Sequence, residues 1–360
     1  MQSFDTIPEQ EEAKRLLTAA LEEGPAHAYL FHGPRGVGKR AAALAFAGEL
    51  LGAPERVARE AHPDLYVLEP LGDQIRIDPI RELRRDLHMR PFEAERRVYL
   101  IAGAHLMNED AADALLKDLE EPPEYAVIVL LADELGPISP TIRSRCQHVP
   151  FRRLSQRAIR EFLAARGVEG AELEALARTA AGRLDRAQRL LDPEAGERRA
   201  ALIELARSVY LDPGFDPGAA ERTVNEFARE RGAEARALAE AANAGEETEK
   251  QREQRAARAG RGAEREQVLD VLDFLAGWYR DLVVAAAGAE QAVLNSDRLA
   301  LLSADAQPER ALAAERAAEA VRETWRTFEE LNVQPGLALE ALFVRLRREL
   351  AAALGAAGKM

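Results

Sequence analysis

Residues 1–153 alternate short apolar runs with segments that favour helix. The apolar runs predict four buried strands, at residues 28–31, 65–68, 97–101 and 126–131. The segments between them predict helices at residues 39–51, 79–88 and 108–121, the last of them stopped by two prolines. Strands that alternate with helices are typical of a parallel sheet with crossover connections. The pattern therefore predicts an α/β domain over residues 1–153.

After this region the strand signals end. Ser155 is expected to cap a helix over residues 157–166, and shorter helices are expected at residues 173–180 and 184–191. Gly182 separates the last two of these segments. We therefore predict a small helical domain over residues 154–205.

The remainder, residues 206–360, has the apolar spacing of a helical domain. Apolar side chains recur every three or four residues from Val268 to Leu282 and again from Leu339 to Leu350. Residues 206–245 mix helix formers with prolines and glycines and match no single element. We predict a third, all-helical domain over the whole stretch.

Residues 246–266 are rich in charge and contain Gly260 and Gly262. Such a segment is either a solvated helix or a flexible linker. The residues other than glycine favour helix, so we expect a helix that frays at the two glycines.

Composition limits the class of protein. Alanine, leucine, glutamate and arginine are abundant and aromatic residues make up only 5%, which favours a largely helical chain. The net charge of −13 argues against a protein that coats nucleic acid, although a local basic patch stays possible. A single cysteine, Cys146, excludes a disulfide within the chain and a cysteine-rich zinc site.

The chain also lacks membrane and targeting signals. The sequence MQSFDTIPEQEEAKRLL contains acidic residues and no apolar core of a signal peptide. No segment approaches the about 18 consecutive apolar residues that span a bilayer. We expect a soluble, cytoplasmic protein with no membrane partner.

A glycine-rich loop lies between the first predicted strand and the helix that follows it. Its sequence fits G-x-x-x-x-G-K as far as the lysine, and such a loop surrounds phosphate with backbone N–H groups while the lysine adds positive charge. The alternative is a glycine-rich turn without a ligand, but the strand, loop and helix stand in the order that the motif requires. The predicted nucleotide-binding residues are Gly33, Gly36, Val37, Gly38, Lys39 and Arg40.

The chemistry that normally accompanies this loop is missing. Arg40 stands where a hydroxyl should ligate Mg²⁺, and Ala102 and Gly103 follow the strand that should deliver a metal-binding carboxylate. Metal and a positioned water carry most of phosphoryl-transfer catalysis, so we expect no intrinsic ATP hydrolysis and no bound metal. No cofactor is required on this interpretation, and weak binding of ATP, ADP or phosphate stays open.

A second candidate lies after the last predicted strand. Residues 140–146 place Arg143 and Arg145 at the edge of the first domain. They are either ordinary surface arginines or an arginine finger, whose guanidinium stabilises charge on a neighbouring subunit's γ-phosphate. The residues alone do not decide between the two.

Five segments together resemble the bacterial DNA polymerase III clamp-loader subunits, a family of AAA+ proteins. They are HAYLFHGPRGVGK at 27–39, HPDLYVLEP at 62–70, IRELRRDLHMRPFEAERRVYLIAGAH at 80–105, DALLKDLEEPP at 113–123 and TIRSRCQ at 141–147. WYRDL at 278–282 and NVQPGLALEAL at 332–342 look like the family's helical collar. The resemblance implies a P-loop AAA+ domain, a small helical lid and an all-α collar.

Departures from the ATP-hydrolysing gamma/tau type make the chain similar to the delta-prime type. The gamma/tau type has an Asp-Glu pair at positions 102 and 103 and four zinc cysteines in the region of residues 51–62; this chain has neither, so no zinc is expected. Residues 131–134 lack the γ-phosphate-sensing threonines, and Asp185 stands at the sensor arginine. The retained motif is Ser144, Arg145 and Cys146, to which the resemblance assigns a finger acting in trans.

The resemblance implies a non-hydrolysing ring subunit of the DNA polymerase III holoenzyme, associated with the replisome in the nucleoid. Its partners would be gamma/tau and delta subunits, with the sliding clamp and primed DNA reached through the complex. Two alternatives remain: an active ATPase of the gamma/tau type, and a stand-alone AAA+-derived adaptor.

Overall fold

The computed structural model describes residues 4, 7–70, 74–191, 195–241, 249–330 and 335–357. The chain divides into two compact units. The first holds the described residues up to Phe162 together with Ala180–Ala187, and the second holds Leu163–Thr179 and the described residues from Gln188 onward. The three-domain boundaries at 153/154 and 205/206 stay a prediction. Within the described residues, no helix is long and apolar enough to cross a membrane.

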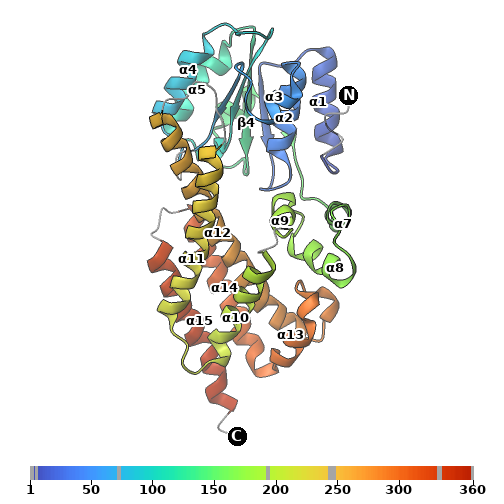
Figure 1. Ribbon diagram of the computed structural model, residues 1–360, viewed down its shortest axis with the longest axis vertical. Coiled ribbons are helices and arrows are strands. Elements are labelled where there is room, and N and C mark those ends of the chain that lie inside the picture. Colours follow the sequence, from blue (N-terminus) through green and yellow to red (C-terminus); the bar gives the residue numbers. More distant parts are fainter. Residues whose placement is uncertain are drawn as a thin grey trace. The chain divides into compact units, whose positions relative to one another are not determined.

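A five-stranded parallel sheet forms the centre of the first unit, in the order β2-β3-β4-β1-β5 (Figure 1). The four predicted strands are confirmed. A fifth, β5, was not predicted because it is short and its sequence QHVP is mostly polar or partly exposed. It pairs with β1 at the edge of the sheet, where a proline is tolerated. The strands are β1 Ala28–His32, β2 Leu65–Leu68, β3 Arg97–Ile101, β4 Ala126–Ala132 and β5 Gln147–Pro150.

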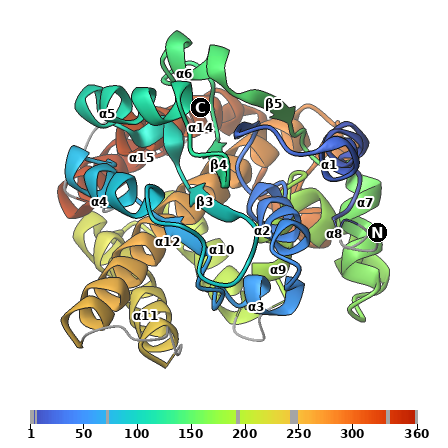
Figure 2. The same ribbon diagram turned by 90° about the horizontal axis from the view of Figure 1, so that it is seen from above.

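Helices cover both faces of this sheet (Figures 1 and 2). Alternate strand residues point to opposite faces: Tyr29 and Phe31 pack with α1, α2 and α3, whereas Leu30 packs with α4, α5 and α6. Strands buried on both faces explain why the strand sequences are continuously apolar. The helices are α1 Glu11–Glu23, α2 Lys39–Leu50, α3 Pro54–Ala58, α4 Ile77–Leu87, η1 Ala104–Leu106, α5 Glu109–Glu120, α6 Pro140–Arg145, α7 Gln156–Ala164 and α9 Leu184–Arg189, the last two shared with the second unit.

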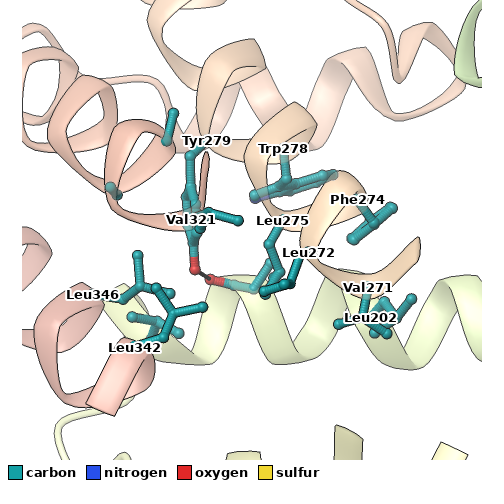
Figure 3. Close-up of a cluster of buried hydrophobic side chains, with 14 of the residues drawn as sticks. Leu202, Val271, Leu272, Phe274, Leu275, Trp278, Tyr279, Val321, Leu342 and Leu346 are labelled. Carbon is teal, nitrogen blue, oxygen red and sulfur yellow. Dashed lines mark hydrogen bonds between the residues drawn. The ribbon is translucent and has the colours of Figure 1, made fainter. Parts of the chain in front are cut away.

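All regular secondary structure among the described residues of the second unit is helical. Its core surrounds Trp278 and Tyr279, which are fully buried (Figure 3). The Trp278 Nε1–H donates to the Tyr210 hydroxyl at 3.3 Å, and the Tyr279 hydroxyl donates to the Ala206 carbonyl at 3.2 Å. The two predicted apolar stripes supply much of this core, which confirms them. The helices are α8 Gly170–Thr179, α10 Ala195–Leu211, α11 Pro217–Ala241, α12 Glu249–Ala286, η2 Glu290–Ala292, η3 Ser296–Arg298, α13 Leu299–Asp305, α14 Pro308–Glu330 and α15 Pro335–Ala357.

The expectation that helix frays at Gly260 and Gly262 is wrong. α12 runs unbroken through both glycines for 38 residues. Gly260 lies against α11, where an added Cβ would come within 3.1 Å of the Gly232 carbonyl oxygen, so the absence of side chains lets the two helices approach closely. Packing between helices therefore outweighs the low helix propensity of glycine. Residues 246–248 of the predicted segment lie outside the described residues.

The ambiguous stretch at residues 206–245 is resolved as far as residue 241. Pro213 and Gly214 lie between two helices: α10 ends at Leu211, and Pro217 begins α11, which continues through Gly218 and Gly232. Proline at a helix start is favourable because its missing N–H has no helical partner there.

Candidate functional site

The glycine-rich loop has a backbone that only glycine adopts easily. Gly33, Gly36 and Gly38 have φ values of 141°, 73° and 99°. A Cβ on Gly33 would lie 2.1 Å from the Phe151 carbonyl oxygen, so this position also excludes any side chain. Val37 between them is fully buried. The loop therefore has the positive φ values that its glycines allow, and binding of phosphate by it stays a prediction.

Lys39, at the start of α2, turns its ammonium group inward onto the protein. Its Nζ donates to the carbonyl oxygens of Gly33 at 2.5 Å and Pro34 at 2.7 Å, and to Asp133 Oδ1 at 2.7 Å. The lysine is only 7% exposed. Burial lowers its pKa, and the Asp133 carboxylate partly opposes that effect. The charge expected to face phosphate is thus satisfied by the chain itself.

Asp133 follows β4 directly, so it reaches the same sheet edge as Lys39. Its N–H donates to His105 Nδ1 at 3.2 Å. Burial lowers the pKa of His105, which favours the neutral ring that this acceptor role requires. The pairing of Lys39 with Asp133 was not predicted from the sequence. The signal in the sequence was an acidic residue directly after β4. This strand lies next to β1, which leads into the glycine-rich loop.

Asp185 lies against the tip of the same loop. The Leu184 N–H donates to the Gly36 carbonyl at 2.7 Å, and a Cβ on Gly36 would come within 1.8 Å of Asp185 Oδ1. Arg183 holds this carboxylate through an ion pair of 2.8 Å. Position 185, where the resemblance placed a sensor arginine, therefore brings negative charge to the loop that should receive phosphate. Like charges in such a site repel.

Arg40 is held by carboxylates on two loops. Its guanidinium contacts Glu60 at 2.6 Å and Glu69 at 2.7 Å. Burial alone would lower the pKa of Arg40, but these two carboxylates raise it overall. A cation bound in this way cannot ligate Mg²⁺.

The other expected metal position is also without a ligand. Ala102 and Gly103 follow β3 and offer no carboxylate. Gly103 has a φ of 65°, and a Cβ there would lie 3.3 Å from Leu106 and 3.4 Å from Pro70. A carboxylate side chain at this position would be strained and crowded by apolar groups. No cluster of three or more metal-binding side chains occurs among the described residues.

Arg145 ends α6 and has a separate set of contacts. Its Nη1 donates to the Thr141 carbonyl at 3.0 Å, and its Nη2 pairs with the Glu120 carboxylate. The side chain is 31% exposed. Ser144 is exposed and its hydroxyl also donates to the Thr141 carbonyl, at 3.0 Å. Cys146 is buried, and burial raises the pKa of its thiol to about 12.

The sequence matches known replication proteins over its first part. Residues 9–155 match the family model described as "DNA polymerase III, delta subunit". The delta' subunit of Bacillus subtilis is 32% identical over 57% of this chain and 66% of its own length, and that of Pseudomonas aeruginosa is 38% identical over 50% and 60%. The tau subunit of Bacillus subtilis is 34% identical over 44% of this chain and 30% of its own length. The matches span less than two thirds of each relative.

Among solved structures, a DNA polymerase III gamma subunit-related protein from Thermotoga maritima has a TM-score of 0.46 at 16% identity, over 94% of this chain and 100% of that one. This structural similarity is too low to support any conclusion about the fold beyond the strand order described above. The similarity to known proteins therefore rests on the sequence matches to delta' and gamma/tau proteins. These matches support a clamp-loader AAA+ subunit that is similar to the delta' and gamma/tau proteins.

Proposed function

We propose that this chain is a non-hydrolysing, delta-prime-like subunit of a ring that loads the sliding clamp onto primed DNA. In this proposal it assembles with gamma/tau and delta subunits in the cytoplasm, at the replisome. It supplies Arg145 in trans to the ATP of a neighbouring subunit. The observation that carries the proposal is the closed state of its own phosphate loop, with Lys39 bound to Asp133 and Asp185 against Gly36.

Several features argue against turnover at this loop. Phosphoryl transfer needs a cation at the outer phosphates, a metal ion and an oriented water. Here Lys39 is bound to three oxygens of the chain, Arg40 to two carboxylates, and position 102 has only a methyl group. Nucleotide or phosphate would have to break the Lys39–Asp133 pair and approach the Asp185 carboxylate, so any binding is weak. Neither a cofactor nor zinc is needed in this account.

The retained arginine supports action in trans. Arg145 lies at the end of a short helix and keeps part of its guanidinium exposed. A guanidinium brought to a γ-phosphate stabilises the charge that develops during transfer. The chain lacks the expected metal ligands at its own phosphate loop, but it has an arginine at the edge of its domain. This combination is consistent with a subunit that assists ATP hydrolysis at a neighbouring subunit.

The isolated, full-length chain tests the first half of the proposal. With saturating Mg²⁺ and ATP we expect phosphate release at background, and calorimetry with millimolar ATP should give little or no heat. A purified gamma/tau-type subunit provides the positive control. Turnover near one per second or faster, an ordinary enzymatic rate, would instead identify an active ATPase with unusual ligands. Failure to co-purify with gamma/tau-like and delta-like chains would favour the stand-alone adaptor.

A further inference from the structure

The guanidinium of Arg145 is folded back onto its own helix. Its Nη1 donates to the carbonyl of Thr141, four residues earlier in α6. Its Nη2 pairs with Glu120 on α5. A side chain that bonds to its own helix end and to a neighbouring helix is retracted, because reaching another subunit requires it to extend away from both.

Glu120 is held firmly beside α6. It is the last residue of α5, a helix capped at its start by Asn108, and Pro122 and Pro123 follow it in the chain. Apolar side chains of α5 and α6, including Leu119 and Ile142, share one buried cluster. The helix packing therefore fixes where the Glu120 carboxylate stands, whereas the carboxylate itself is 48% exposed and accessible to solvent.

The neighbouring acidic residues do not duplicate this contact. Asp118 is buried and paired with Arg84 at 2.5 Å. Glu121 is exposed, and it follows the end of the helix. Among these three carboxylates, Glu120 is the one in contact with Arg145.

We propose that Glu120 is a latch that holds the Arg145 finger retracted until primed DNA brings a neighbouring subunit's nucleotide within its reach. This inference rests on the proposed function of Arg145. The γ-phosphate carries more negative charge than one carboxylate and accepts a guanidinium with matching geometry, so it competes for the same N–H groups. A partly exposed ion pair shifts an equilibrium by about 1.5- to 5-fold, which is enough to restrain an idle ring without blocking a loaded one.

Rings reconstituted from full-length subunits test the latch through Glu120→Gln, which keeps the shape of the side chain and removes its charge. We expect ATP turnover without DNA to rise about 1.5- to 5-fold. Turnover with primed DNA should stay within about twofold of the wild type, since the finger is already extended there. The stimulation by DNA therefore falls. Glu121→Gln removes the adjacent charge and should change neither rate.

Two further variants separate the latch from the finger. Arg145→Ala should lower turnover, and the double variant Glu120→Gln/Arg145→Ala should equal Arg145→Ala alone, because the latch acts only through the arginine. Unchanged turnover in Arg145→Ala would contradict the finger itself. A low rate in Arg145→Ala together with a wild-type basal rate in Glu120→Gln would overturn the latch alone.

A decrease in both rates in Glu120→Gln would also overturn the latch, because Glu120 would then be holding the finger in its productive position. Co-elution with partners and the melting temperature check that each variant is folded and assembled. If Glu120→Gln does not assemble, Glu120→Asp provides the second variant. Its shorter side chain weakens the contact while keeping the charge, and we expect it to raise the basal rate in the same direction.

Discussion

Lys39 has a structural role in this chain, and substitution should reveal it. In an active phosphate loop the lysine contacts the ligand, and replacing a residue that serves function often leaves the stability of the protein unchanged or raises it. Here the ammonium group is buried and bonded to Gly33, Pro34 and Asp133. We therefore expect Lys39→Met, which preserves much of the volume of the side chain, to destabilise the first unit in the absence of any nucleotide.

The expected size follows from the three bonds. The two carbonyl acceptors lose their partner at about 1 kcal/mol each. Asp133 is 36% exposed and can turn to water, so its loss is discounted. Removing the charge also relieves the cost of burying it, which is the cause of the lowered pKa of Lys39. The net cost is therefore about 1 to 2 kcal/mol, which for a unit of this size lowers the melting temperature by about 2 to 8 °C.

Hydrogen exchange of peptides from β1 and β4, measured by mass spectrometry, reports on the unit that contains the loop. Both peptides should exchange faster in Lys39→Met, whereas Lys117→Ala, at an exposed site on α5, should leave them unchanged. Asp133→Asn combined with Lys39→Met should cost less than the sum of the two single variants. Wild-type or slower exchange in Lys39→Met would refute the reasoning and mean that the lysine is held ready for a ligand.

Two other predictions concern buried groups of the first unit. Burial alone would raise the pKa of Asp64, but N–H bonds from Glu93, Phe92 and Ala94 lower it overall. Its contribution to the free energy of unfolding is therefore complete above the unfolded pKa of about 4 and lost as the pH falls through the lower folded value. Urea titrations from pH 7 to 2 should show that the free energy of unfolding falls less steeply with decreasing pH in Asp64→Asn than in the wild type. An equal slope in both proteins would contradict this. Cys146, with a thiol pKa raised to about 12 by burial, should resist iodoacetamide at pH 8 until urea unfolds the chain, and rapid labelling of the native protein would show that the thiol is accessible.

The sequence predicted elements whose signals are local. Four strands were recognisable from continuous apolar runs, and the helices between them from helical spacing. The glycines at positions 33, 36 and 38 indicated a loop with positive φ values. β5 escaped detection because an edge strand of four residues needs few apolar positions. The course of α12 through Gly260 depended on its packing against Gly232, which no local pattern encodes.

The sequence showed which residues of the nucleotide-binding motif are missing. It did not show which side chains pair with the residues that replace or remain in the motif. Arg40 and Ala102 could be recognised as departures from a motif. The partners of Lys39 and of Arg40 are distant in sequence: Asp133 lies 94 positions from the lysine, and Glu60 lies 20 positions from the arginine. Such pairs depend on which strands end side by side, so they became visible only once the sheet order was known. The contact between Arg145 and Glu120 belongs to the same class.

In the proposed function, this subunit performs no chemistry itself and completes a neighbour's site with Arg145. The most direct test uses rings in which only the subunit next to this chain keeps its phosphate-loop lysine, so that turnover comes from one site. Arg145→Ala in this chain should then reduce DNA-stimulated turnover by about 10³-fold, the order of effect of an arginine finger. Arg152→Ala, at a side chain that is 83% exposed, should leave the rate unchanged. Equal turnover in Arg145→Ala and wild-type rings would contradict the claim and leave the subunit a scaffolding role alone.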